Sequence, residues 1–527
     1  MIRLAWPIMV IQLLQVAYNI ADTIWLGRYN VDALGAISLA FPLVFLLISV
    51  AGGFTAAGAI LVAQYTGAES EGSAGEVAGQ TLSFVVLLSM GLGALGYLFT
   101  EDLLALIPTQ QETAIQVIPL AADYMEVIFL GVPFMFGFFI FSSLMRGYGN
   151  TRTPMRVMFV SVLINVVVDP FLIFGWWRFP ELGIQGAAVA TILSRAVATV
   201  LGLYILFNAS SGPDVRLSYL KPDLSYIKEI VSLGVPTAAE QSASALAMVT
   251  LSVLVYQFAP PVVAAYGLGN RLASLVFLPA MGLGRATNTM VGQNLGADKA
   301  DRAETAAWLA VKVGAGVMFV VAVLAALFPG PIVGVFVDAS LPDATATIRL
   351  SSEYIRIRAV EFAFIGVLQP LLGAFRGAGN TKTAMSFSLL ALWIGRVPAV
   401  SLLAFPAIAL GPFVLDGFGL GATGIWIGMA LGNTLGAIAA AAWFTRGTWK
   451  AAVIDETGAG SGGPGASGDT TESEVGDESR TAIGDDAGAI ESIDSAADGD
   501  DRDGVPGPET GATVDGGDNT PSESVED

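Results

Sequence analysis

Two aspartates within apolar stretches of the chain, Asp22 and Asp169, are the most reactive candidates in the sequence, together with Asn165 and Thr191. The 527 residues include neither histidine nor cysteine. This composition excludes a zinc site with those ligands, a cysteine or serine–histidine nucleophile pair, and a histidine proton relay. Any chemistry with protons or metal ions must therefore use carboxylate, amide, hydroxyl or backbone oxygens.

These four polar residues come to a similar depth if their apolar stretches are helices that cross a membrane. Asp22 and Asp169 each lie about six residues, or ~9 Å, from the outer ends of their stretches, and Thr191 lies ~12 Å inside. Asn165 is one turn from Asp169 on the same helix face. Pro170 has no N–H group, so it frees a backbone carbonyl for a cation. Because a carboxylate in a bilayer is costly, we predict a cluster that binds Na⁺, with H⁺ able to compete.

The residues around this cluster leave other interpretations open. The two acids could serve only as hydrogen-bonding contacts between helices. Arg195 lies one turn from Thr191 and could form an ion pair with Asp169, which would neutralise that carboxylate.

Two further carboxylates lie in apolar stretches of the second half. Glu240 is the alternative candidate for the coupling acid, although we favour an ion pair between Glu240 and Arg271 or Arg285. Glu361 lies close to two arginines of its own stretch. We assign Glu361 to a charge cluster at the membrane surface.

The elements that must position these residues are membrane-spanning helices. The chain is 54% hydrophobic and 13% charged, whereas soluble domains carry ~25% charged residues. Its mean hydropathy is +0.67, and a helix needs ~20 apolar residues to cross the hydrocarbon core. Twelve such stretches predict an all-α polytopic membrane protein, with approximate spans 4–26, 33–66, 78–100, 119–145, 154–175, 183–207, 229–258, 262–294, 303–328, 353–375, 384–410 and 421–445.

Basic residues indicate the orientation of these spans. An even number of spans places both termini on one side, and lysine and arginine gather in the segments on that side, including Arg146, Arg152, Lys221 and Arg376. Cytoplasmic loops carry an excess of these residues. We therefore expect a multi-pass protein of the cell membrane with both termini in the cytoplasm.

The net charge of −20 belongs almost entirely to the C-terminal segment. Residues 451–527 contain 21 acidic and two basic residues, and they lack aromatic side chains. A segment with so few apolar residues cannot bury enough surface to fold. We predict that residues 449–527 form a disordered acidic cytoplasmic tail.

Two sequence patterns recur at nearly one interval. RGYGNTRT, which begins at Arg146, returns as RGAGNTKT at Arg376, with six of eight positions identical. VAQYTGA, which begins at Val62, returns as VGQNLGA at Val291. The intervals of 230 and 229 residues indicate an internal duplication.

The duplication predicts two parallel six-helix lobes, because equivalent helices are separated by an even number of crossings. The lobes are expected at 1–210 and 229–448, joined by a cytoplasmic linker at 211–228. Repeats of this kind in transporters place the substrate site between the lobes.

The twelve spans in two halves, the twin RGxGNTxT loops, and NIADTIWLG at Asn19–Gly27 resemble the multidrug and toxic compound extrusion (MATE) family. The resemblance covers about residues 1–448. It implies a secondary active antiporter that exports a cationic or amphiphilic drug-like compound in exchange for Na⁺ or H⁺, and not an enzyme. It further implies that Asp22, Asn165, Asp169 and Thr191 match the cation-coupling cluster of archaeal members.

The family resemblance also suggests substrate contacts and a hinge. Gln15, Tyr18 and Asp22 share one face of the first helix, and the resemblance makes them substrate contacts together with Asn165. Packing against a neighbouring helix is the alternative role for Gln15 and Tyr18. Pro7 resembles the bending proline of the family, although an ordinary proline at a helix start would look the same.

The expected partners are a small-molecule substrate and the lipid bilayer, without nucleic acid. We expect a monomer with no cofactor beyond the coupling ion, Na⁺ or H⁺. The alternative function is a flippase for lipid-linked or polysaccharide precursors, because a related superfamily shares this architecture. Such flippases tend to line their cavities with basic residues, whereas the cluster found here is mainly acidic.

Overall fold

The computed structural model of the protein describes residues 1–105, 111–336, 344–410 and 413–454. The chain separates into one compact unit, Met1–Gly462, and a second unit, Gly463–Asp527, which is outside the described residues. The predicted acidic tail from residue 455 onward therefore also lies outside them.

The described part of the chain is a succession of long helices that form two groups. The first lobe comprises α1 (Ile2–Tyr29), α2 (Val31–Gly67), α3 (Glu71–Leu98), α4 (Thr100–Ala105), α5 (Gln111–Gly147), α6 (Arg152–Phe174) and α7 (Gly183–Asn208). The second lobe comprises α8 (Leu224–Val255), α9 (Pro260–Gly296), α10 (Ala300–Leu327), α11 (Pro329–Gly334), α12 (Ala344–Gly377), α13 (Thr381–Leu389), η2 (Leu390–Arg396), α14 (Val397–Ala404) and α15 (Gly421–Phe444). The short helix η1 (Leu217–Leu220) lies on the connection between them.

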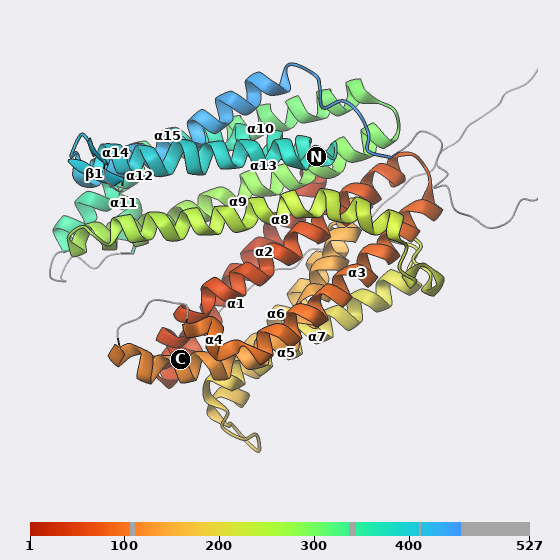
Figure 1. The fold of residues 1–527 in the computed structure, drawn as a ribbon, viewed down its shortest axis with the longest axis horizontal. Coiled ribbons are helices and arrows are strands. Elements are labelled where there is room, and N and C mark those ends of the chain that lie inside the picture. Colours follow the sequence, from red (N-terminus) through yellow and green to blue (C-terminus); the bar gives the residue numbers. More distant parts are fainter. Residues whose placement is uncertain (106–110, 337–343, 411–412, 455–527) are drawn as a thin grey trace, which may run out of the picture. The chain divides into compact units, whose positions relative to one another are not determined.

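Each lobe is held together by one central long helix. In the first lobe α5 packs against α2, α3 and α7, and in the second lobe α12 packs against α9, α10 and α15. Figure 1 shows the two sets of helices as separate groups. They meet where α2 contacts α8 and α9 and where α1 contacts α9.

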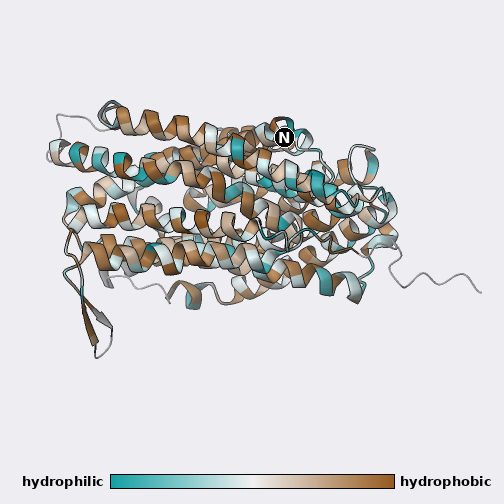
Figure 2. Ribbon diagram, turned by 90° about the horizontal axis from the view of Figure 1, so that it is seen from above, coloured by the Kyte–Doolittle hydropathy of each residue, from teal (hydrophilic) through white to brown (hydrophobic). Residues whose placement is uncertain are grey.

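Twelve helical segments of the described chain are long and apolar enough to span a membrane. Figure 2 shows that hydrophobic residues predominate along them. The prediction of an all-α polytopic membrane protein is confirmed. Eleven of the twelve spans end within a few residues of their expected C-terminal bounds, and several of them begin earlier than expected. Local sequence explains the start of α2. Asn30 accepts a hydrogen bond from the backbone N–H of Asp32 at 2.8 Å and so caps α2.

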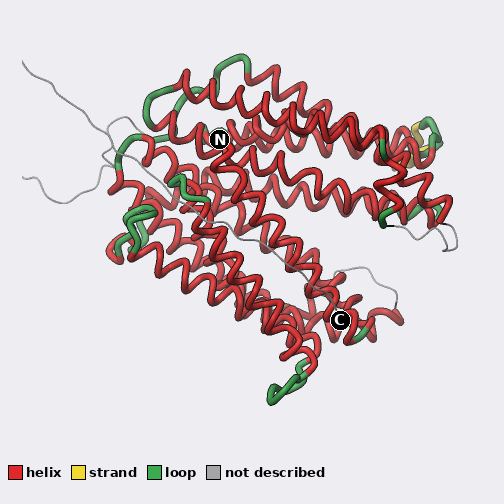
Figure 3. Tube along the Cα trace, turned by 180° about the vertical axis from the view of Figure 1, so that it is seen from behind, coloured by secondary structure: helices red, strands yellow, loops and turns green. Residues whose placement is uncertain are grey.

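The eleventh span is shorter than predicted. It consists of α13, the π-helical segment η2 and α14, and it ends at Ala404 rather than near residue 410. Pro406 explains the stop, because the residue before a proline is driven out of the helical region, and Phe405 is extended. The antiparallel strands β1 (Ala407–Leu410) and β2 (Phe413–Asp416) follow, with Ala407 opposite Asp416 (Figure 3).

Residues 449–454, which the sequence places in the acidic tail, pack against the helices. Trp449 is buried and stacks on Phe444 with a 4.4 Å centroid separation. Lys450 forms an ion pair with Glu304 at 2.6 Å. This ion pair and its hydrogen bond raise the pKa of Lys450, which lies outside the spans. The chain is therefore anchored to the second lobe for a few residues beyond the last helix.

The lobes are joined on the side of the twin loops by two equivalent hydrogen bonds. Gln64 of the first lobe donates to the Gly377 carbonyl of the second lobe at 3.0 Å. Gln293, its counterpart in the repeat, donates to the Gly147 carbonyl of the first lobe, also at 3.0 Å. The duplicated sequence thus builds a reciprocal contact, which we call the inter-lobe latch.

Gly67→Ala is expected to open the inter-lobe latch. A Cβ at Gly67 would lie 1.9 Å from the carbonyl oxygen of Gln293, a backbone atom that cannot rotate away. The helices must then separate, and a reporter cysteine placed by Thr289→Cys should react with maleimide about tenfold faster, a shift of ~1.4 kcal/mol. The native chain has no cysteine, so the reporter would be the only thiol.

Gly72→Ala is the matched control, because a Cβ at Gly72 meets nothing within 4 Å. The labelling rate should not change in that variant. An unchanged rate in Gly67→Ala would contradict the idea that close backbone contact holds this side shut.

Candidate functional site

Helices α1 and α6 bring the two first-lobe aspartates together. Asn165 and Asp169 are fully buried on one face of α6, and Asn165 Nδ2 donates to Asp169 Oδ1 at 3.0 Å. Asp22 on α1 lies directly beside both of them. Three of the four predicted cation-coupling residues therefore form one cluster, which we call the acidic cluster (Asp22, Asn165 and Asp169).

The acidic cluster contains buried oxygens without partners. Asp22 Oδ1, Asn165 Oδ1 and Asp169 Oδ2 are all inaccessible, and no donor of the described chain bonds to them. The Asp22 and Asp169 carboxyl groups lie within hydrogen-bonding reach of each other, a contact that two carboxylates can make only through a shared proton. Buried polar atoms nearly always have a partner, and all three of these atoms are acceptors. Two adjacent carboxylates also repel each other unless positive charge lies between them. The arrangement is suited to hold a proton or a small hard cation.

The acidic cluster is sparse for a metal site. The described residues contain no group of three or more His, Cys, Asp or Glu side chains that could hold a metal ion. A Na⁺ ion would therefore use the amide oxygen of Asn165 and backbone or water oxygens in addition to the two carboxylates. Helix α6 runs through Pro170 to Phe174, so the helix is not interrupted at the cluster.

Thr191 joins the acidic cluster through Tyr18 rather than directly. The Tyr18 hydroxyl donates to Thr191 Oγ1 at 2.7 Å, and both side chains are buried. Tyr18 lies one turn from Asp22 on α1, within electrostatic range of it. Gln15, a further turn away, donates to Asn19 at 3.2 Å. The predicted substrate contacts Gln15 and Tyr18 thus already have partners inside the lobe.

Arg195 forms no ion pair with the acidic cluster, although it lies within electrostatic range of Asp22. Its guanidinium donates to Gln15 Oε1 at 2.8 Å and contacts the sulfur of Met158 at 3.2 Å. It lies over the rings of Tyr18 and Phe138, with centroid distances of 5.1 and 5.4 Å. Among the described residues no ion pair links Arg195 to an acid, so the alternative of an Arg195–Asp169 pair is not realised.

Glu240 forms an ion pair, but with a partner other than those expected. Its carboxylate accepts from Arg376 at 2.5 Å and from the Ser388 hydroxyl. The expectation that Arg271 or Arg285 would pair with it is wrong, since Arg285 donates to Gln12 at 3.1 Å instead. Arg376 lies in the last turn of α12, where the second RGxGNTxT motif begins, and pairs with Glu240 on α8, so the partner is distant in the sequence.

The surface assignment of Glu361 is also wrong. The side chain is fully buried near the middle of α12, where Arg358 Nε donates to it at 2.6 Å. Arg396 of η2 approaches its other oxygen at 3.6 Å. Sequence reasoning placed Arg358 near Glu361 correctly along the helix but did not show that the Glu361 side chain points into the lobe.

Two further residues of the first lobe are Pro7, near the start of α1, and Tyr124, which lies close to the acidic cluster. Helix α1 continues through Pro7, which is buried; its role as a hinge stays a prediction. Tyr124 of α5 is buried within electrostatic range of Asp22 and Asp169, and the sequence reasoning missed it. A tyrosine in the middle of an apolar span was the available signal.

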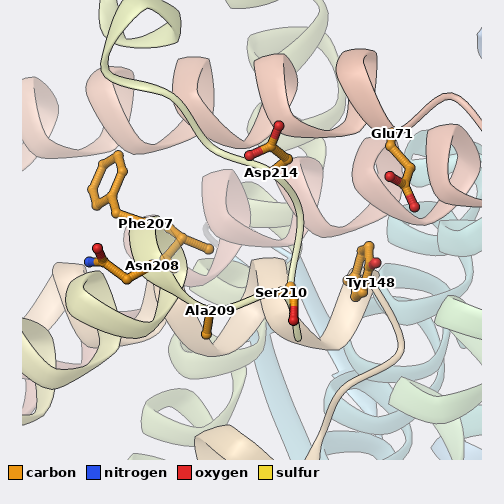
Figure 4. A pocket seen from close by; sticks show the side chains of 9 residues that line it. Glu71, Tyr148, Phe207, Asn208, Ala209, Ser210 and Asp214 are labelled. Carbon is orange, nitrogen blue, oxygen red and sulfur yellow. The ribbon is translucent and has the colours of Figure 1, made fainter.

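A separate hollow lies at the end of α7. It has a volume of about 430 Å³ and is lined by Glu71, Tyr148, Leu206, Phe207, Asn208, Ala209, Ser210, Gly212 and Asp214 (Figure 4). Asp214 and Glu71 face it from the inter-lobe connection and the start of α3. None of the predicted site residues lines this hollow, so it is not the site that the acidic cluster defines.

The duplicated helical lobes and a buried acidic cluster define a multi-pass membrane transporter. The MatE family model matches residues 7–171 and again residues 236–400, two stretches that start 229 residues apart. The chain therefore belongs to the MatE family, as its sequence motifs predicted, and it is a transporter rather than an enzyme.

Known relatives agree over nearly the whole helical region. The chain is 32% identical over 408 residues to the probable multidrug resistance protein YoeA of Bacillus subtilis, covering 76% of this chain and 85% of that protein. It is 28% identical to the probable multidrug resistance protein NorM of Thermotoga maritima, over 85% and 92% of the two chains. The solved outward-facing conformation of a multidrug resistance MATE family transporter of the MOP superfamily matches with a TM-score of 0.76 at 24% identity, over 85% and 95% of the chains.

Proposed function

We propose that this protein is a secondary active antiporter that exports cationic or amphiphilic drug-like compounds in exchange for Na⁺ or H⁺. The observation that carries the proposal is the acidic cluster, whose three unpartnered oxygens are all acceptors. The names of the relatives, multidrug resistance proteins, support the substrate class. The protein acts as a monomer in the cell membrane, with both termini in the cytoplasm, an orientation supported by the basic residues near the twin loops.

In this mechanism the cation and the substrate act through the two lobes. A coupling ion drives exchange only if it binds one conformation better than the other. Na⁺ or H⁺ entering the acidic cluster would satisfy the free oxygens of Asp22 and Asp169 and remove their repulsion. Helix α1 packs against both α6 and α9. A shift of α1 on ion binding would therefore transmit the event at the acidic cluster to the second lobe.

A flippase for lipid-linked or polysaccharide precursors is the second candidate. Three arginines on the side of the twin loops favour it, namely Arg146, Arg285 and Arg376. Arg285 lies within electrostatic range of the other two. The carboxylate paired with this group is Glu240, which is bound to Arg376. Such a basic group suits an anionic headgroup better than a cationic drug.

Movement of a fluorescent cationic dye by purified wild-type protein in lipid vesicles tests the proposal. Na⁺ and pH gradients are imposed separately, and the dye is expected to move only when one of them is present. That gradient identifies the coupling ion. Dye that fails to move under either gradient, while a labelled lipid-linked precursor crosses the bilayer, would favour the flippase.

A further inference from the structure

The second lobe contains a polar cluster that mirrors the charge of the first-lobe site. It is built from α12, which carries Arg358 and Glu361, and from η2, which carries Arg396. Asn433 of α15 approaches Glu361 at 3.5 Å. We call Arg358, Glu361 and Arg396 the basic cluster, because two guanidinium groups surround one carboxylate.

The basic cluster has an uncompensated positive charge. Arg358, Glu361 and Arg396 are 2%, 0% and 7% exposed, so water does not solvate them freely. Glu361 pairs with both arginines, and it is the sole carboxylate in the described chain within ion-pair distance of either. Glu353, on the preceding turn, is engaged by the Thr423 hydroxyl instead. A net charge of this kind is costly in a membrane-embedded lobe unless an anion accompanies it.

Unpartnered hydrogen-bond donors accompany this charge. Arg396 Nε and Trp426 Nε1 are both buried and bond to no atom of the described chain. Trp426 packs edge-on against Tyr354 at 4.8 Å, and the Tyr354 hydroxyl both receives a hydrogen bond from Arg358 and donates to Asn270 at 2.7 Å. Tyr354 therefore lies against both the guanidinium of Arg358 and the ring of Trp426. Each nitrogen of Arg358 already has a partner in Glu361, Tyr354 or Asn270, so the free N–H groups of this region are those of Arg396 and Trp426.

The two clusters differ in the kind of atom that lacks a partner. In the acidic cluster the free atoms are oxygens that accept hydrogen bonds, and in the basic cluster they are N–H groups that donate. Acceptors with excess negative charge require a cation, and donors with excess positive charge require an anion. The local backbone fits a binding site as well, since Arg396 ends the π-helical segment η2 and such segments often occur at functional sites.

We propose that the second lobe binds a chloride-sized monovalent anion at Arg396, with the free N–H of Trp426 as the second donor. Near-complete burial of all three charged residues restricts the site to a small ion and excludes a bulky substrate headgroup. This assignment does not depend on which gradient drives transport. It gives the transporter a resident counter-ion in the lobe opposite to the acidic cluster.

Equilibrium binding of radioactive chloride to the purified full-length protein tests the proposal, with gluconate replacing chloride at constant Na⁺. Wild type is expected to bind one chloride per chain with saturation. Arg396→Gln is expected to lose saturable binding because the excess charge disappears. Glu361→Gln should bind chloride about tenfold more tightly, because the competing carboxylate is gone.

Two further variants separate a specific site from a general loss of folding. Trp426→Phe retains the ring but removes the N–H, and we expect several-fold weaker binding. Arg195→Gln removes a buried arginine from the first lobe and should leave chloride binding unchanged. If Arg396→Gln does not fold, the opposite shifts in Glu361→Gln and Trp426→Phe still decide the matter.

Three results would overturn the assignment. The first is absence of saturable chloride binding in wild type, and the second is unchanged affinity in both Glu361→Gln and Trp426→Phe. The third comes from competition with acetate, which should displace chloride poorly. Equal displacement would show that the site takes a carboxylate group rather than a halide.

Discussion

Vesicles containing Asp169→Asn are expected to move a cationic dye no faster than empty vesicles under either a Na⁺ or a pH gradient. Asparagine has the size of aspartate and still offers an oxygen to Asn165, so the local packing should survive. The charge that attracts the coupling ion is lost. Mutation of residues that only hydrogen-bond to a metal ligand typically lowers metal affinity or activity 10–100-fold. Loss of Asp169, a direct ligand in this proposal, should therefore lower the affinity for the coupling ion roughly a hundredfold or more.

Asp22→Asn should have the same effect, since its free carboxylate oxygen belongs to the same cluster. Asp32→Asn is the matched control, because it removes one negative charge from an exposed position at the start of α2. Initial rates of dye movement at equal protein content provide the measurement. If both cluster variants kept the wild-type rate and its dependence on a gradient, the acids would serve only as contacts between helices.

The helices and their duplication could be predicted because both depend on composition along the chain. A run of about 20 apolar residues identifies a membrane span whatever it packs against. The predicted eleventh span is too long because the stretch around Pro406 is still apolar in β1, and hydropathy does not distinguish a strand from the end of a helix.

Depth along a helix could also be predicted, and it brought Asp22, Asn165 and Asp169 to one level. Rotation of a helix and the choice of its neighbour could not. In a soluble helix the polar face shows which side is buried. Here apolar residues face both lipid and the lobe interior, so the sequence could not show that Glu361 points inward. Nor could it show that Glu240 meets Arg376, which lies at the end of α12, 136 residues away.

The same limit explains why the basic cluster was missed. Its arginines come from α12 and η2, and the aromatic ring beside them comes from α15. Only the packing of these three elements shows that Arg358 and Arg396 together carry more positive charge than the single carboxylate of Glu361 neutralises.

We expect the protein to lose more stability when Arg376 is removed from the Glu240–Arg376 ion pair than when Glu240 is removed. Arg376→Gln leaves a carboxylate that is 5% exposed without its counter-charge, whereas the arginine side chain is 22% exposed and can reach solvent. Arg376→Gln should therefore lower the free energy of unfolding by about 3–5 kcal/mol, and Glu240→Gln should lower it by less. Unfolding of the purified proteins in a denaturing detergent titration would measure the difference.

Arg146→Gln is the matched control for this comparison, because Arg146 is the repeat counterpart of Arg376 and its guanidinium donates to Ser143 rather than to an acid. It should cost little. The double variant Glu240→Gln with Arg376→Gln removes both charges and should recover most of the stability lost in Arg376→Gln, since no charge is left unpaired. Transport by this double variant then separates the two roles of Glu240. If the pair only stabilises the second lobe, a stable double variant still moves dye under the coupling gradient. If the double variant is stable but no gradient drives it, Glu240 takes part in coupling and the acidic cluster of the first lobe does not act alone.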